Sequence, residues 1–209
     1  MTDLDVLRSD RVLSVVRAER IPDPADLCHA LAAGGIRTVE LTFTTPGVLD
    51  HLRACADAVA RDGIVLGVGT VMTGDQARAA IDAGARFLVT PGLRPEVAEV
   101  AAAGSVSIFL GALTPTEVAQ AVDLGSAAVK IFPASSMGPK YLSDLHGPYP
   151  AVEFLPSGGI NPGNAQSYLD AGALAVCAGT GVVPPAEVAA GNWADITDRA
   201  RNFVAAITS

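Results

Sequence analysis

The chain has 209 residues, of which 50% are hydrophobic and 17% are charged, so it can bury a large core and is not a disordered chain. Its net charge of −8 argues against a nucleic-acid-binding protein, although backbone N–H groups and arginines can still hold a small anion. We see neither a signal peptide nor the ~20 consecutive apolar residues that cross a membrane. We therefore expect a cytoplasmic protein with one domain over residues 1–209 and no membrane partner.

Short apolar runs and alanine-rich segments alternate along the chain. The residues before Val12 are expected to form a short helix, and those from Asn192 to Ile207 the last helix. Eight apolar runs predict strands, at Val12–Arg17, Thr38–Phe43, Ile64–Gly69, Phe87–Thr90, Val106–Leu110, Ala127–Phe132, Val152–Leu155 and Leu174–Ala178. Helical spacing between them, often after a proline, predicts helices that include Pro24–Ala33, Gly74–Ala83, Pro95–Ala103 and Pro115–Leu124.

Glycine recurs at the ends of these helices, where we expect left-handed caps, at Gly34, Gly63, Gly84, Gly104, Gly125, Gly147 and Gly172. Eight strands alternating with helices predict an α/β fold, a single (β/α)8 TIM barrel with a short N-terminal helix. An open doubly wound sheet is the main alternative, but no G-x-G-x-x-G motif follows the first strand. A leucine-rich solenoid would need L-x-x-L-x-L repeats, which the chain lacks.

Active sites of β/α barrels lie at the C-terminal ends of the strands, so we looked for chemistry there. Lys130 lies inside the sixth apolar run, and a lysine is rarely buried unless it is paired or functional. A low-dielectric interior disfavours the ammonium form, and a neutral amine can attack a ketone to form an imine. An ion-paired structural lysine is the alternative interpretation.

Glu40 lies in the second predicted strand and shares one face with Thr42 and Thr44, because side chains alternate along a strand. The residues between them are apolar and suit packing against helices. A carboxylate that points into the barrel can serve as a general acid/base. It could instead be a structural partner of Lys130 or Arg17.

Other strand ends offer groups that can contact a substrate or simply form turns. Arg17 can hold a carboxylate or phosphate, and Thr70 and Pro91 end the third and fourth strands. Glycine-rich loops end the last two strands and could bind phosphate through Ser157, Gly158, Gly159, Gly179 and Thr180. The histidines lack metal-ligand spacing, so no metal site is expected, and the cysteines Cys28, Cys55 and Cys177 are expected to be reduced and partly buried.

Five motifs in order carry a resemblance to a known family over nearly the whole chain. They are Ala33-Gly34-Gly35-Ile36 with Val39-Glu40-Leu41-Thr42, Gly67-Val68-Gly69-Thr70-Val71, Thr90-Pro91-Gly92, Val129-Lys130-Ile131-Phe132-Pro133 and Pro156-Ser157-Gly158-Gly159-Ile160. The chain resembles the 2-keto-3-deoxy-6-phosphogluconate (KDPG) aldolases, also described as 4-hydroxy-2-oxoglutarate aldolases. The resemblance implies a homotrimer that needs no cofactor and acts on a small phosphorylated 2-keto acid.

The resemblance also implies roles for individual residues. Lys130 resembles the Schiff-base lysine and Glu40 the proton-transferring glutamate of the family. Arg17, Thr44, Thr70, Pro91 and Phe132 match the substrate site, and Ser157, Gly158, Gly159, Gly179 and Thr180 match its phosphate end. Some members carry an arginine where this chain has Thr44, and there it helps to hold the substrate carboxylate. Arg17 is therefore expected to take more of this role here.

We accordingly predict a class I aldolase, a carbon–carbon lyase that cleaves KDPG to pyruvate and glyceraldehyde 3-phosphate, and also 4-hydroxy-2-oxoglutarate. The sequence does not distinguish this activity from cleavage of 2-keto-3-deoxy-6-phosphogalactonate. Two other classes stay open: a phosphate-binding barrel isomerase or epimerase without an imine lysine, and a non-catalytic ligand-binding barrel in which Glu40 and Lys130 form a structural pair.

Overall fold

The computed structural model describes residues 3–207. Its eight strands are parallel and form one sheet in the order β7-β6-β5-β4-β3-β2-β1-β8. A parallel bridge from Phe154 to Ala173 spans the remaining gap, so the barrel is nearly closed. The strands are β1 (Val12–Val16), β2 (Thr38–Thr42), β3 (Val65–Gly69), β4 (Phe87–Val89), β5 (Ser107–Ala112), β6 (Ala128–Ile131), β7 (Phe154–Pro156) and β8 (Val176–Ala178). All eight predicted strands are present, and the predicted (β/α)8 barrel is confirmed.

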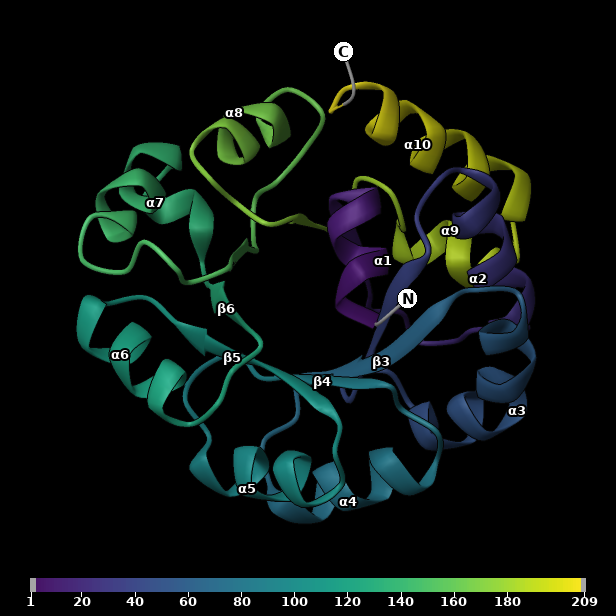
Figure 1. Ribbon diagram of the computed structural model, residues 1–209. Coiled ribbons are helices and arrows are strands. Elements are labelled where there is room, and N and C mark those ends of the chain that lie inside the picture. The colour runs from purple at the N-terminus through teal and green to yellow at the C-terminus, as the bar shows by residue number, and fades with distance from the viewer. Residues whose placement is uncertain (1–2, 208–209) are drawn as a thin grey trace.

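The helices surround the barrel as a ring, whereas α1 lies within that ring (Figure 1). They are α1 (Asp3–Asp10), α2 (Pro24–Ala33), α3 (Val48–Arg61), α4 (Gly74–Asp82), α5 (Pro95–Ala103), α6 (Pro115–Asp123), α7 (Pro139–His146), α8 (Ala165–Asp170), α9 (Pro185–Ala190) and α10 (Trp193–Ala205). The short N-terminal helix is confirmed as α1. The last predicted helix corresponds to α10, while α9 was not predicted because six residues are too few for a clear helical period.

Local sequence explains where several helices begin. The Asp23 side chain accepts hydrogen bonds from the backbone N–H groups of Ala25 and Asp26, which start α2. Thr114 and Glu117 form a reciprocal capping box at the start of α6. These caps fix the loops that leave the strands, and the candidate site is built from such loops.

The predicted left-handed caps are wrong at three positions. Gly34, Gly104 and Gly147 have φ angles of −89°, −84° and −54°, because the helical turn continues through them. The positive φ falls one residue later at Gly35 and Ser105, at 95° and 53°. Gly34 is needed for a different reason, since a Cβ atom there would lie 2.4 Å from the Cβ of Ala200 in α10.

Two apolar cores stabilise the fold. The larger core lies between the strands and the surrounding helices and includes Val39 and Leu41 of β2. The smaller core fills the barrel and is built from Leu13, Val65, Phe87, Phe109 and Leu155, with Val6 and Leu7 of α1 packed against it. Helix α1 therefore plugs one end of the barrel, and the site described below lies at the other.

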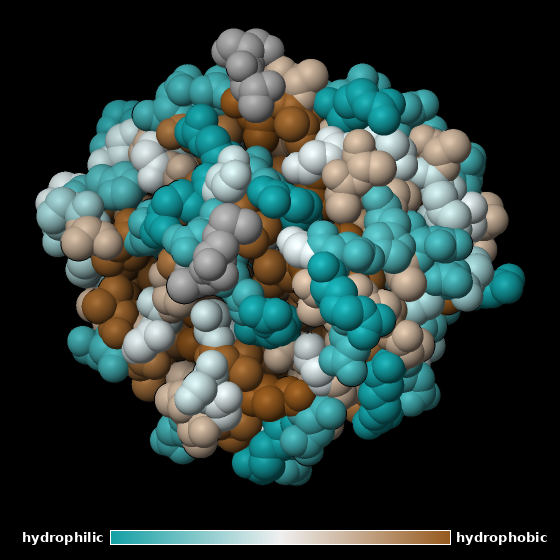
Figure 2. Space-filling view, turned by 45° about the vertical axis from the view of Figure 1, so that its right-hand side comes forward, coloured by the Kyte–Doolittle hydropathy of each residue, from teal (hydrophilic) through white to brown (hydrophobic). Residues whose placement is uncertain are grey.

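Hydrophilic residues cover much of the face in Figure 2, with apolar residues gathered toward its lower left. Within residues 3–207, no helix is both long and apolar enough to cross a bilayer. The three cysteines are free and fully buried rather than partly buried as expected. Cys28 and Cys55 meet between α2 and α3, and hydrogen bonding to Cys55 raises the pKa of Cys28.

Candidate active site

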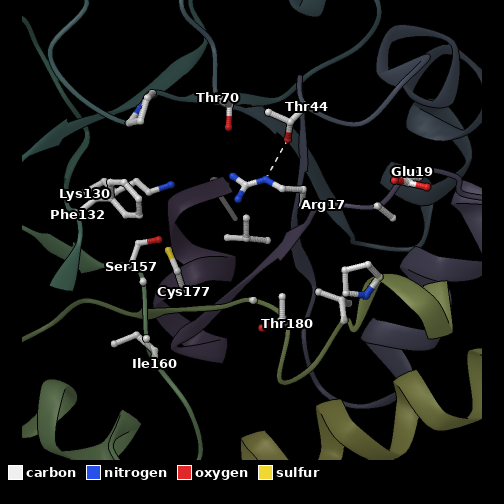
Figure 3. A pocket seen from close by; sticks show the side chains of 18 residues that line it. Arg17, Glu19, Thr44, Thr70, Lys130, Phe132, Ser157, Ile160, Cys177 and Thr180 are labelled. Carbon is white, nitrogen blue, oxygen red and sulfur yellow. Dashed lines mark hydrogen bonds between the residues drawn. The ribbon is translucent and has the colours of Figure 1, made fainter. Parts of the chain in front are cut away.

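A cavity of about 620 Å³ opens at the C-terminal ends of the strands. It is lined by eleven of the twelve residues singled out in the sequence: Arg17, Thr44, Thr70, Pro91, Lys130, Phe132, Ser157, Gly158, Gly159, Gly179 and Thr180. The twelfth, Glu40, lies in ion-pair contact with Lys130 at the base of the cavity. Residues from seven strands or the loops after them thus converge on one volume, as Figure 3 shows for those it labels.

Lys130 and Glu40 form the buried centre of the site. Only 7% of Lys130 and 1% of Glu40 is exposed. Lys130 Nζ lies 3.8 Å from Glu40 Oε2, which is an ion-pair distance but too long for a hydrogen bond. Both Glu40 oxygens lack a hydrogen-bond partner among the described residues. The carboxylate is therefore free to exchange a proton with a group that enters between it and the amine.

Burial raises the pKa of Glu40 above its ordinary value of 4.5, because desolvation penalises the carboxylate. The positive charges of Lys130 and Arg17 oppose this shift and offset only part of it. A carboxyl group whose pKa moves toward neutrality is better suited to give and take protons near pH 7.

Gly69 of β3 leaves the space that the Glu40 carboxyl group occupies. A Cβ atom at Gly69 would lie 1.7 Å from Glu40 Oε1 and 2.2 Å from its carboxyl carbon. Strands β2 and β3 are neighbours, and Gly69 pairs with Thr42, two residues beyond Glu40 on the same face of β2. A glycine is thus required at the end of β3 for a glutamate to extend inward from β2.

Phe132 follows Lys130 by two residues and lies on the same side of the chain. The Lys130 ammonium lies 5.8 Å from the centre of its ring, within cation–π range. Gly158 has a φ of 93°, and a Cβ atom there would lie 3.3 Å from the Phe132 ring. The β7 loop therefore packs closely over the phenylalanine and narrows the cavity beside the lysine.

Arg17 enters the cavity from the end of β1. Its Nε donates a hydrogen bond of 3.0 Å to Thr44 Oγ1, drawn as a dashed line in Figure 3. The guanidinium group points across the cavity toward Lys130 (Figure 3). Thr44 lies beyond the end of β2, so it reaches this position through the turn after the strand rather than by strand alternation.

Thr70 lines the cavity with a left-handed backbone, at a φ of 56°. This conformation is unusual for a β-branched residue, and such strain is common at functional sites. Pro91 also lines the cavity, and its carbonyl carbon would be 2.3 Å from a Cβ atom at Gly111. The β4 loop can therefore reach inward only because β5 carries a glycine beneath it.

The β7 and β8 loops form the other side of the cavity. Ser157 is 6% exposed and hydrogen-bonds Cys177, whose thiol has a pKa raised to about 12, chiefly by burial. Gly159 has a φ of 76°, and a Cβ atom there would lie 2.5 Å from Ser135. Gly179 has open space where a Cβ atom would stand. The groups that this side offers are backbone N–H groups and the hydroxyls of Ser157 and Thr180.

Sequence reasoning missed seven lining residues: Val15, Ala18, Glu19, Ile160, Cys177, Val183 and Pro185. Strand alternation could have found Val15 and Cys177, because each stands two residues before a strand-end residue that was identified. Within the described part of the chain, no group of three or more His, Cys, Asp or Glu side chains could hold a metal ion.

Comparison with known proteins assigns the chain to a family. The family model for KDPG and KHG aldolases matches residues 4–199. A 2-dehydro-3-deoxy-phosphogluconate aldolase from Treponema pallidum (strain Nichols) is 38% identical, over 94% of this chain and 93% of the relative. A KHG/KDPG aldolase from Escherichia coli (strain K12) is 32% identical, over 95% of this chain and 93% of the relative.

A solved structure supports the same assignment. It is a KDPG aldolase from Legionella pneumophila with pyruvate captured as a covalent carbinolamine intermediate. It superposes with a TM-score of 0.87 at 29% identity, covering 96% of this chain and 97% of that one. The chain belongs to the KDPG and KHG aldolase family and is an aldolase, a carbon–carbon lyase.

Proposed function

We propose that this aldolase cleaves KDPG to pyruvate and glyceraldehyde 3-phosphate, and also acts on 4-hydroxy-2-oxoglutarate, through a Schiff base on Lys130. The observation that carries the proposal is a buried amine 3.8 Å from a buried carboxylate that has no hydrogen-bond partner among the described residues. A permanent structural pair would gain from direct hydrogen bonds, whereas this pair leaves room for a reacting group between its members.

Lys130 Nζ attacks the C2 ketone, and the C2 oxygen departs as water to leave an iminium ion. Glu40 takes the proton from the C4 hydroxyl, the C3–C4 bond breaks, and its electron pair moves to the imine nitrogen as an enamine. The aldehyde then leaves, Glu40 returns a proton to C3, and water hydrolyses the imine to release pyruvate. Glu40 suits both proton transfers, because desolvation raises its pKa.

Arg17 is the residue that we assign to the substrate carboxylate. Apart from Lys130, it is the only cation among the described residues that line the cavity, and its guanidinium points toward the lysine. The carboxylate of a 2-keto acid is bonded to the carbon that Lys130 attacks, so it must lie close to the amine. Thr70, Pro91 and Phe132 would then enclose the three-carbon portion that becomes pyruvate.

The phosphate is assigned to the opposite side, formed by Ser157, Gly158, Gly159, Gly179 and Thr180. This side carries hydroxyls and glycine backbone rather than basic side chains. Successive backbone N–H groups in such loops can form a concave site for an anion. We also propose that the enzyme is cytoplasmic and that it forms a homotrimer. Sedimentation at several protein concentrations would test the trimeric state.

Borohydride reduction in the presence of pyruvate tests the imine. We expect a stable three-carbon adduct on Lys130, located by peptide mass mapping. Lys140 provides an internal control, because its side chain is 85% exposed and paired with Asp144 at 2.7 Å. An adduct on Lys140 alone, or no adduct, would rule out the proposed mechanism.

Substitution of each lysine completes the test. Lys130→Arg should abolish pyruvate release from every 2-keto-3-deoxy acid tested, because arginine stays protonated and forms no imine. Lys140→Arg should retain turnover. A panel that includes the gluconate and galactonate epimers would then define the preferred configuration at C4.

A further inference from the structure

A chain of three hydrogen bonds joins Arg17 to the buried end of β2. Arg17 Nε donates to Thr44 Oγ1 at 3.0 Å, and Thr44 Oγ1 lies 2.8 Å from Thr42 Oγ1. Thr42 Oγ1 donates in turn to the carbonyl oxygen of Val16 at 3.2 Å. The chain therefore returns to the residue that precedes Arg17, and it forms a closed ring across the ends of β1 and β2.

The number of available hydroxyl hydrogens determines which group donates and which accepts in each hydrogen bond of the ring. Each threonine hydroxyl has one proton, and a carbonyl oxygen can only accept. If Thr42 gave its proton to Thr44, its oxygen would face the Val16 carbonyl without a hydrogen between them. With Thr42 donating to Val16 and Thr44 donating to Thr42, every contact is satisfied, and Thr44 presents a lone pair to Arg17.

We propose that Thr42 and Thr44 are positioning residues that act through Arg17, and that Thr44 does not donate a hydrogen bond to the substrate. The proposal rests on the proposed function, in which Arg17 holds the substrate carboxylate. The ring occupies Nε of the guanidinium group and leaves its two terminal nitrogens, which point toward Lys130, for a bidentate contact (Figure 3).

Burial explains how an exposed arginine can be held in one place. Thr42 is fully buried at the end of β2, so its side chain is fixed by packing. A long arginine side chain otherwise loses rotamer freedom when it binds a ligand. Anchoring Nε through Thr44 to the buried hydroxyl of Thr42 removes part of that freedom before the substrate arrives, which should lower the concentration needed for binding.

The test measures the pyruvate concentration that gives half-maximal borohydride trapping on Lys130. Thr42→Val should raise it about 3- to 10-fold, as expected for a weakened hydrogen bond to a charged group. Thr42→Ser keeps the hydroxyl and should restore the original value. Thr38→Val is the matched control, because Thr38 is a buried threonine of the same strand whose hydroxyl has no partner in the described residues.

A double-mutant cycle with Arg17→Met separates positioning from scaffolding. If Thr42 acts through Arg17, Thr42→Val should change the half-saturating concentration by less than about 2-fold once Arg17 is replaced. Thr44→Val should behave in the same way, which keeps the test decisive if Thr42→Val unfolds. If the effects of the threonine and Arg17 substitutions on the half-saturating concentration are additive, the positioning proposal is overturned, although trapping by the unmodified chain still supports the aldolase. If the unmodified chain shows no trapping, the proposed function itself is refuted.

Discussion

The two ends of the barrel interior use the same construction for opposite purposes. At the end closed by α1, Phe87 and Phe109 stack with ring centres 5.3 Å apart in an apolar core. At the open end, Glu40 and Lys130 occupy the equivalent interior space. In both places a glycine of β3 makes room for a large side chain, Gly67 for Phe87 and Gly69 for Glu40. The apolar end stabilises the fold, and the polar end uses the resulting rigidity and low dielectric for chemistry.

The contrast between the two ends of the barrel predicts that, of the substitutions considered below, one at Glu40 has the largest effect on activity. Glu40→Gln keeps the shape of the side chain but cannot transfer a proton, so kcat should fall by about 10² to 10⁴. Substrate binding should change less than kcat, because the lost interaction acts mainly in the transition state. Steady-state kinetics together with thermal melting check this. A variant that melts much earlier but keeps its kcat would show that Glu40 is a structural residue.

The two glycines of β3 offer a matched pair of substitutions. Gly69→Ala places a methyl group 1.7 Å from the present position of Glu40 Oε1 and must move the carboxylate. A displacement of about 1 Å can cost on the order of 10²-fold in rate, so kcat should fall accordingly.

Gly67→Ala adds the same methyl group 2.5 Å from the Phe87 ring, in the apolar end. Such overpacking should lower the free energy of unfolding by about 1 to 3 kcal/mol with a smaller loss of kcat. Denaturant unfolding and kinetics on both variants measure the contrast. Equal losses of rate would mean that the two ends are not separable.

The phosphate side of the cavity should give a smaller effect. Gly159 is a poor place for a test, because its φ of 76° and the nearby Ser135 would strain any side chain. Gly179 is open, so Gly179→Asp can introduce a carboxylate with little strain.

Gly179→Asp should raise KM for a phosphorylated substrate at least about 5-fold, because like charges a few ångströms apart repel by about 1 kcal/mol even in water. KM for an unphosphorylated 2-keto acid should change less. Gly179→Asn, of nearly the same size but uncharged, is the control. Equal effects of Asp and Asn on both substrates would show that the loop does not hold phosphate.

The smallest effect concerns the pH dependence of stability. Desolvation raises the folded-state pKa of Glu40 above 4.5, so the folded chain binds this proton more tightly than the unfolded chain. The resulting stability is present at pH values below the unfolded pKa and is lost as the pH rises through the folded pKa. The Tm of Glu40→Gln minus that of the unmodified chain should therefore increase with pH over this window. A decrease would mean that the ion pair with Lys130 outweighs desolvation.

Much of the fold follows from local patterns in the sequence. Proline at the first turn and an apolar period set α2 and α5, whose bounds match the prediction at both ends. The predicted ends of strands were less accurate. The fifth strand was predicted to end at Leu110, but β5 extends through Ala112 because its pairing with β6 continues beyond the apolar run. Hydrogen bonding to a neighbouring strand, rather than local composition, decides where a strand ends.

The sequence by itself determined the barrel and placed Lys130 and Glu40 on inward-facing strand positions, because period-two alternation and repeated βα units are local properties. Only the tertiary structure decided that a glycine on β3 makes room for Glu40, that Thr42 and Thr44 connect to Arg17, and that Cys177 lies beside Ser157. These contacts join residues on different strands. Their geometry depends on strand register and barrel closure, which many residues determine together and no single segment encodes.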